Sequence, residues 1–171
     1  MAVATMPSLD EIEAAAERVL QRTGIDAPPV NPTRVAEALG YQVRAALFRD
    51  PDLSGCVSVQ DGVTLIEVSA LDGAARRRFT IAHEIGHAQL HLRDARTGAF
   101  TDTPRHQRLA SIAPGADPSE VNANQFAAAL LMPRDWVEQA FARDRDVATL
   151  ARRFHVSLDA MTFRLKNLSL A

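Results

Sequence analysis

The pentad His-Glu-Ile-Gly-His at residues 83–87 constrains the fold of this 171-residue chain more than any other segment. It lies in a helix-compatible run, and residues four apart lie one above the other on a helix. Both imidazoles can therefore reach one divalent cation, and Glu84 projects beside them where a water molecule would sit. The pattern predicts a helix at about residues 74–92. It also predicts a zinc hydrolase, with a chance occurrence of the five residues as the alternative.

Composition limits the classes of protein that fit. The chain is 47% hydrophobic with a net charge of -2, which predicts one compact unit with a real core and no strongly basic surface for nucleic acid. Cys56 is the only cysteine, and residues 1–10 lack the pattern of a secretory leader. No run approaches the roughly 20 apolar residues that span a bilayer. We therefore expect a cytoplasmic protein without a membrane role.

The segment before the pentad predicts two helices and a small sheet. Ser8 and Glu11 form a capping-box pair for a helix ending at Gly24, and Asn31 with Pro32 begins a short second helix. Three strands are then expected, at residues 41–48, 56–60 and 63–68, with an Asp-Gly hairpin turn at 61–62. An exposed strand of this sheet would be a candidate for binding substrate backbone.

After the pentad helix, residues 93–117 are polar, lack periodicity and predict a long loop. Catalytic zinc needs a third protein ligand, and Glu120 opens a second helix that ends before Pro133. Asp117 and Glu120 also fit the N-cap and N3 positions, so Glu120 could be only the acid of a capping box. Asn124 lies one turn later on the same face, where its carbonyl could accept an N–H from a metal-bound histidine. That pairing favours the metal interpretation.

Three stretches together resemble the ImmA/IrrE metallopeptidases: residues 77–87, the Glu-x-x-Ala-Asn-x-Phe-Ala run at 120–127, and Leu-Leu-Met-Pro at 130–133. The resemblance extends from about Tyr41 to the C-terminus. One departure is Asn122, where many relatives carry a second acid. The resemblance implies an α+β fold, with a zincin-like (gluzincin) core, a small β-sheet and a C-terminal helix-turn-helix-like helical bundle.

The resemblance also implies a site. His83, His87 and Glu120 would bind Zn²⁺, with Mn²⁺ as a second candidate, and Glu84 would be the catalytic glutamate. The implied activity is endoproteolytic cleavage of a helix-turn-helix transcriptional repressor, which would derepress genes of a stress response or a mobile element. The separate sensor domain of larger radiation-response members is not expected in so short a chain.

Two classes of protein other than an enzyme stay open from the sequence. One is a transcription regulator that binds DNA through the C-terminal helices and uses its metal for structure or sensing. The other is a non-catalytic interaction module. We place the peptidase domain, with its N-terminal helices, at 1–142 and a helical segment at 143–171. Its last helix offers only Arg164 and Lys166 against Asp159, so packing onto the core is preferred over DNA binding.

Two further residues are candidates for the cleft. His91 shares the helix face of the pentad histidines, but histidines spread over eight residues span about 12 Å, too far for all to bind one ion. It could line the cleft or stabilise an oxyanion, although a hydrogen-bonded structural role is favoured. Tyr41 could also donate to an oxyanion, but its alternating context favours packing in a strand.

Overall fold

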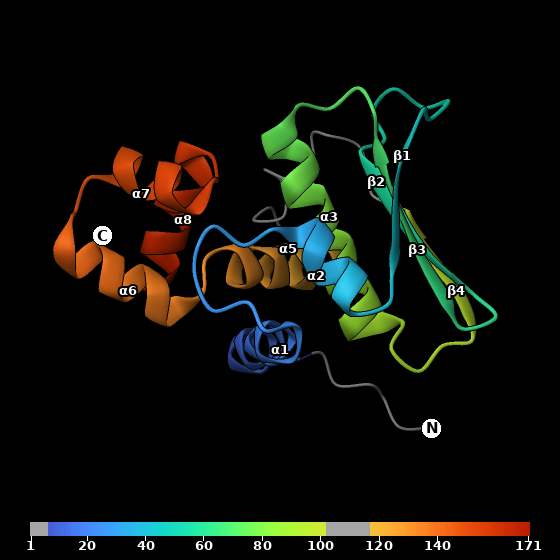
Figure 1. Ribbon diagram of the computed structural model, residues 1–171, viewed down its shortest axis with the longest axis horizontal. Coiled ribbons are helices and arrows are strands. Elements are labelled where there is room, and N and C mark those ends of the chain that lie inside the picture. Colours follow the sequence, from blue (N-terminus) through green and yellow to red (C-terminus); the bar gives the residue numbers. More distant parts are fainter. Residues whose placement is uncertain (1–6, 102–116) are drawn as a thin grey trace.

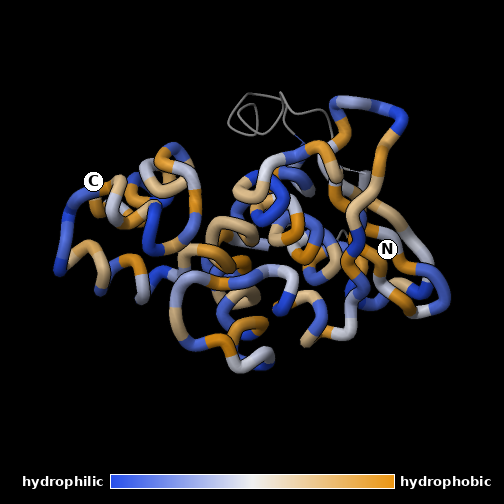
Figure 2. Tube along the Cα trace, turned by 45° about the horizontal axis from the view of Figure 1, so that its top comes forward, coloured by the Kyte–Doolittle hydropathy of each residue, from blue (hydrophilic) through white to orange (hydrophobic). Residues whose placement is uncertain are grey.

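The computed structural model describes residues 7–101 and 117–171. A four-stranded sheet lies at one end of the molecule, a group of longer helices fills the middle, and three short helices form the opposite end (Figure 1). Hydrophobic and hydrophilic stretches alternate along these elements (Figure 2), as expected for amphipathic segments around a shared core. No helix in the described part of the chain is both long and apolar enough to cross a membrane.

The N-terminal helices form where their capping residues predict. Helix α1 (Leu9–Thr23) starts with a complete capping box, in which the Ser8 hydroxyl accepts from the Glu11 amide and the Glu11 carboxylate accepts from the Ser8 amide. It ends at Gly24, whose φ of 69° is left-handed. Helix α2 (Pro32–Ala38) starts at Asn31, whose side chain accepts from two backbone amides. Both predictions are confirmed.

The strands are β1 (Gln42–Ala46), β2 (Gly55–Gln60), β3 (Val63–Ser69) and β4 (Thr97–Thr101). Their order in the sheet is β1-β3-β2-β4. Strand β1 runs parallel to β3, whereas β2 runs antiparallel to both of its neighbours. Asp61 and Gly62 have positive φ values of 52° and 80°, as a tight hairpin turn between β2 and β3 requires. The three expected strands and the hairpin are therefore present.

Strand β4 corrects the prediction of a long loop at residues 93–117. Its first and last residues lie inside that segment, and it pairs with β2 so that Phe100 lies opposite Val57. Phe100 is the only large apolar residue in β4, so the sequence carries no visible period of two. The strand forms because β2 offers it a free edge, which is a non-local cause. Residues 93–96 connect the preceding helix to β4, and residues 102–116 lie outside the described residues.

Helices α3 (Ala74–His91) and α5 (Pro118–Leu131) form the centre of the molecule. Every residue of α3 from Thr80 to Ala88 is buried. A Cβ added at Gly86 would lie only 3.1 Å from the Ala123 carbonyl oxygen and 3.2 Å from Phe126 Cβ. The glycine thus lets the two helix backbones cross closely, and this contact brings the site residues together.

Helices α6 (Arg134–Arg143), α7 (Val147–Phe154) and α8 (Leu158–Asn167) form the opposite end of the molecule (Figure 1). Arg164 of α8 is only 3% exposed, because it donates to the Met132 carbonyl and pairs with both carboxylate oxygens of Glu13 on α1. Its guanidinium is therefore a packing group and not a surface charge for DNA. The boundary between residues 142 and 143 stays a prediction.

Candidate metal centre

Helix α3 presents His83 and His87 on one face, and α5 presents Glu120 opposite them. The two Nε2 atoms are 3.0 Å apart. One carboxylate oxygen of Glu120 lies 3.2 Å from His83 Nε2, and the other lies 3.2 Å from His87 Nε2. Both histidines are fully buried and the Glu120 side chain is 15% exposed. Three potential ligand atoms from two helices therefore converge at one point.

The dimensions of this group fit a tetrahedral metal ion. The ligand atoms all lie within 4.8 Å of one another. Bonds of 2.0–2.2 Å at tetrahedral angles place neighbouring ligand atoms about 3.3–3.6 Å apart, close to the spacing of this group. Two imidazole nitrogens and a carboxylate are also a donor set that zinc favours in catalytic sites. The residues present are thus suited to hold the metal that the sequence predicts.

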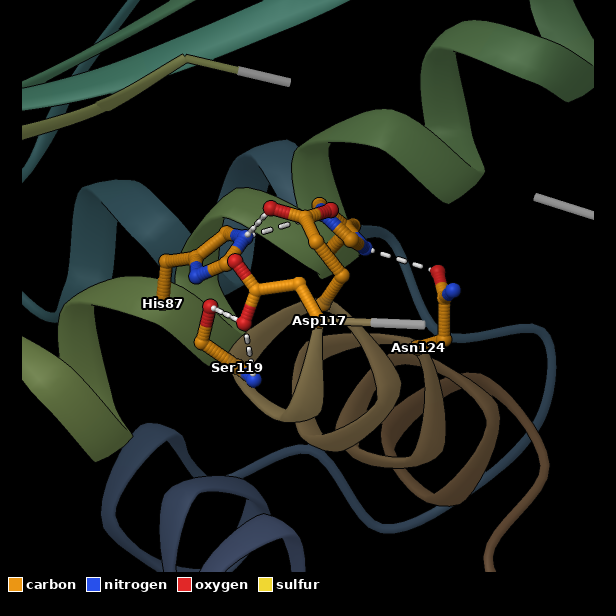
Figure 3. A network of polar contacts seen from close by, with 6 residues as sticks. His87, Asp117, Ser119 and Asn124 are labelled. Carbon is orange, nitrogen blue, oxygen red and sulfur yellow. Dashed lines mark hydrogen bonds and ion pairs between the residues drawn. The ribbon is translucent and has the colours of Figure 1, made fainter. Parts of the chain in front are cut away.

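Asn124 orients one of the two histidines. Its Oδ1 lies 2.8 Å from His83 Nδ1, and Figure 3 shows Asn124 at one side of this network and His87 at the other. An amide oxygen can only accept, so the bond places the ring proton on Nδ1 and leaves the Nε2 lone pair of a neutral ring directed at the site. Asn124 therefore lies where the sequence places it, beside a histidine of the pentad.

Glu120 does not act as the acid of a capping box. The N-cap of α5 is Asp117, whose carboxylate accepts from the amide and the hydroxyl of Ser119 (Figure 3). Burial by itself raises the pKa of Glu120, but the contacts of its carboxylate with the imidazoles of His83 and His87 outweigh burial and lower the pKa to about 2. The carboxylate is therefore ionised at neutral pH and available to a cation.

Glu84 is fully buried between α3 and the sheet. A Cβ added at Gly55, the first residue of β2, would lie 3.1 Å from Glu84 Oε1 and 2.4 Å from Thr80 Cγ2. The start of β2 thus approaches the Glu84 carboxylate so closely that no side chain fits at position 55. Sequence reasoning missed Gly55, because nothing local to it indicates that it faces the pentad helix.

The two other predicted cleft residues lie apart from the three ligand atoms. The ring of His91 is half-buried and lies 5.5 Å from the His87 ring. Its pKa is lowered, mainly by burial and to a smaller extent by the neighbouring His87. Tyr41 precedes β1, and its hydroxyl accepts from Gln89 at 2.5 Å. Gln89 is two residues from His87 and so projects from another face of α3. The structure does not bring Tyr41 to the convergence point.

The sheet packs against α3, and the crossing of α3 with α5 brings two histidines of a His-Glu-x-x-His pentad next to a glutamate. This arrangement is typical of metallopeptidases. Comparison with known proteins gives the same class. Residues 36–166 match the peptidase family described as "IrrE N-terminal-like domain". The match spans more than half of the chain, and the protein belongs to the ImmA/IrrE family of metallopeptidases.

The individual relatives match a smaller part of the chain than the family as a whole does. "Uncharacterized immunity region protein 2" of Bacillus phage phi105 is 46% identical over 63 residues, which are 37% of this chain and 34% of the phage protein. The radiation response metalloprotease IrrE of Deinococcus radiodurans is 33% identical over 115 residues, 65% of this chain and 33% of IrrE. The chain therefore spans about a third of the length of these relatives.

A solved structure of a Mycobacterium tuberculosis transcriptional regulator is similar in fold. It superposes with a TM-score of 0.61, covering 91% of this chain and 46% of the regulator, at 21% sequence identity. At that identity the likeness concerns the fold alone.

Proposed function

We propose that this protein is a zinc-dependent endopeptidase that cleaves a protein substrate. The observation that carries the proposal is the convergence of His83, His87 and Glu120 at 3.0–3.2 Å, with the Glu84 carboxylate buried on the same helix. A purely structural zinc site fills its coordination with protein groups, whereas the three ligands found among the described residues leave a fourth position for water. Membership of a metallopeptidase family supports the catalytic alternative.

In the proposed mechanism, each residue of the chain has a distinct task. A zinc ion held by the three ligands would act as a Lewis acid and lower the pKa of a water molecule. Glu84, which is buried on the same helix as the two histidines, would be the general base that takes a proton from the attacking water and the general acid that protonates the leaving amine. Asn124 keeps His83 in the tautomer that binds metal through Nε2.

Strand β4 is the proposed platform for the substrate. In the described part of the sheet it is an edge strand, paired with β2 on one side. An edge strand presents unpaired backbone groups to which an extended peptide can add as a further strand. Because Phe100 of β4 lies 4.5 Å from the His87 ring, a peptide bound along this edge would run beside the metal centre.

We further propose that the substrate is a helix-turn-helix repressor in the cytoplasm, whose cleavage derepresses its genes. The names of the relatives support this: one belongs to a phage immunity region and another is a radiation response metalloprotease. These names fit proteins that control a stress response or a mobile element.

The test separates metal binding from catalysis. Zinc-loaded protein is incubated with the repressor encoded nearest to its gene, and products are read by mass spectrometry. Glu84→Gln should keep its zinc and lose cleavage at least about 100-fold, because the base is gone while the ligands remain. His83→Ala should lose both. Glu138→Gln, an exposed glutamate of α6, is the matched control. Undiminished cleavage by Glu84→Gln would contradict the mechanism.

A further inference from the structure

Phe100 of β4 lies flat against His87. The two ring centroids are 4.5 Å apart and the ring planes differ by 13°, which is a stacked arrangement. The Phe100 ring also lies 5.4 Å from the ring of His91, tilted by 41°. Aromatic rings attract one another at such separations. One face of His87 is therefore covered by a side chain from the edge of the sheet.

The local structure of β4 explains how this ring reaches the helix. Gly98 and Phe100 are the half-buried residues of the strand and point to the same side, because side chains alternate along a strand. A Cβ added at Gly98 would lie 2.8 Å from Leu92 Cδ2, so the glycine lets β4 approach the C-terminal end of α3. Pairing with Val57 of β2 fixes the backbone of Phe100.

Each histidine of the pentad has a contact that restrains its ring. His83 has its Nδ1 hydrogen-bonded to Asn124 at 2.8 Å, which fixes the direction of the ring. His87 has the face of its ring packed against Phe100. A ligand must hold its ring within a few tenths of an ångström to bind a metal well, and packing can restrict its rotation as a hydrogen bond does.

We propose that Phe100 is a positioning residue, which holds the His87 ring in its metal-binding orientation and links the substrate-binding edge of the sheet to the metal centre. This inference rests on the proposed ligand role of His87. Ala99 and Thr101, the exposed neighbours of Phe100, belong to the edge to which a peptide would add. A peptide on β4 would therefore contact the strand that restrains one of the ligands.

The experiment compares three substitutions of Phe100 by metal binding. Phe100→Ala removes the ring, Phe100→Leu keeps apolar volume without a flat face, and Phe100→Tyr keeps the flat face. Zinc affinity is measured by competition with a chelator, and the geometry of the site by the visible absorption spectrum of the Co²⁺ form. The control is Phe163→Ala on α8, which removes the same side chain from a position that is 42% exposed.

We expect Phe100→Ala and Phe100→Leu to weaken zinc binding on the order of three- to tenfold and to change the Co²⁺ spectrum. Phe100→Tyr should restore both, and Phe163→Ala should change neither. A wild-type affinity and spectrum in Phe100→Leu would overturn the proposal. So would a Phe100→Ala variant whose metal-free form melts at a lower temperature while its zinc affinity is unchanged, since Phe100 would then be only a core residue.

These measurements do not depend on turnover. If the wild-type protein binds zinc but cleaves no repressor, the endopeptidase proposal fails, while the metal-binding comparison among the Phe100 variants still decides the role of this residue. A ring-current shift of the His87 ring protons in the metal-free protein, lost in Phe100→Leu and kept in Phe100→Tyr, provides a second spectroscopic readout.

Discussion

The helix pair α3–α5 and the strand β4 both border the candidate metal centre, but they are held by different kinds of contact. Gly86 on α3 faces backbone atoms of Ala123 on α5, whereas Gly98 on β4 faces the end of the Leu92 side chain. Backbone atoms can give way only if a whole helix moves, while a leucine side chain can rotate. The helix pair therefore fixes where the backbones of the ligand residues lie, whereas the contact of β4 with the end of α3 involves a side chain that can adjust.

The strongest test of this difference is Gly86→Val. The Cβ of the new side chain would already lie 3.1–3.2 Å from atoms of Ala123 and Phe126. A β-branched residue has few rotamers with which to relieve this contact. We expect the free energy of unfolding to fall by about 3 kcal/mol, at the upper end of the usual cost of overpacking. Zinc binding should weaken too, because separation of α3 from α5 moves Glu120 away from the histidines.

Chemical denaturation and chelator competition measure both effects. The control is Gly73→Ala at the start of α3, where an added Cβ meets nothing within 4 Å. Its cost should be limited to the weaker N-cap, about 1 kcal/mol at most. Equal losses in the two variants would show that the helix crossing is not tightly packed.

A second, smaller effect is expected for Asn124→Ala. Loss of the bond to His83 Nδ1 frees the ring and its tautomer, and such partners typically contribute 10- to 100-fold to metal affinity. Chelator competition gives the zinc affinity, and Gln125→Ala, the next amide on α5, serves as the control. Wild-type affinity in Asn124→Ala would mean that the helices position His83 by backbone alone.

The smallest effect is expected for Gly98→Ala. The added methyl group would meet only Leu92 Cδ2 at 2.8 Å, and rotation of that side chain relieves the contact. We expect the free energy of unfolding to change by less than about 1 kcal/mol. Zinc affinity should stay within about twofold of wild type. A loss as large as that of Gly86→Val would show that β4 is as rigidly placed as the helix pair, and the comparison would fail.

The sequence predicted the helix pair well because its pattern is local. The i, i+4 spacing of His83 and His87, the N-cap at Asp117 and the break before Pro133 all act within a few residues, and the observed helices match the predicted ones within two or three residues at each end. The sequence also predicted that Glu120 and Asn124, which are four residues apart, lie on one face of the second helix. Spacing alone could not show that Glu120 faces the histidines, since the crossing of two helices decides this.

Strand β4 was not predictable for a physical reason. Thr97 to Thr101 hold one large apolar side chain, and their strand structure depends on pairing with β2, about 40 residues earlier in the chain. Phe100 therefore carried no sign of a contact with His87. The same limit applies to Gly55, whose approach to Glu84 results from the packing of the sheet on α3.

The buried pair of Glu13 and Arg164 has a consequence for the order of folding. It joins residues that are 151 positions apart in the chain. Helix α8 is synthesised after every other described element, so the Glu13 carboxylate and the Met132 carbonyl gain Arg164 as a partner only after those elements have been made. A nascent chain that already contains both histidines and Glu120 still lacks this contact, and only the synthesis of α8 allows α1 to be fixed to it through the Glu13–Arg164 pair.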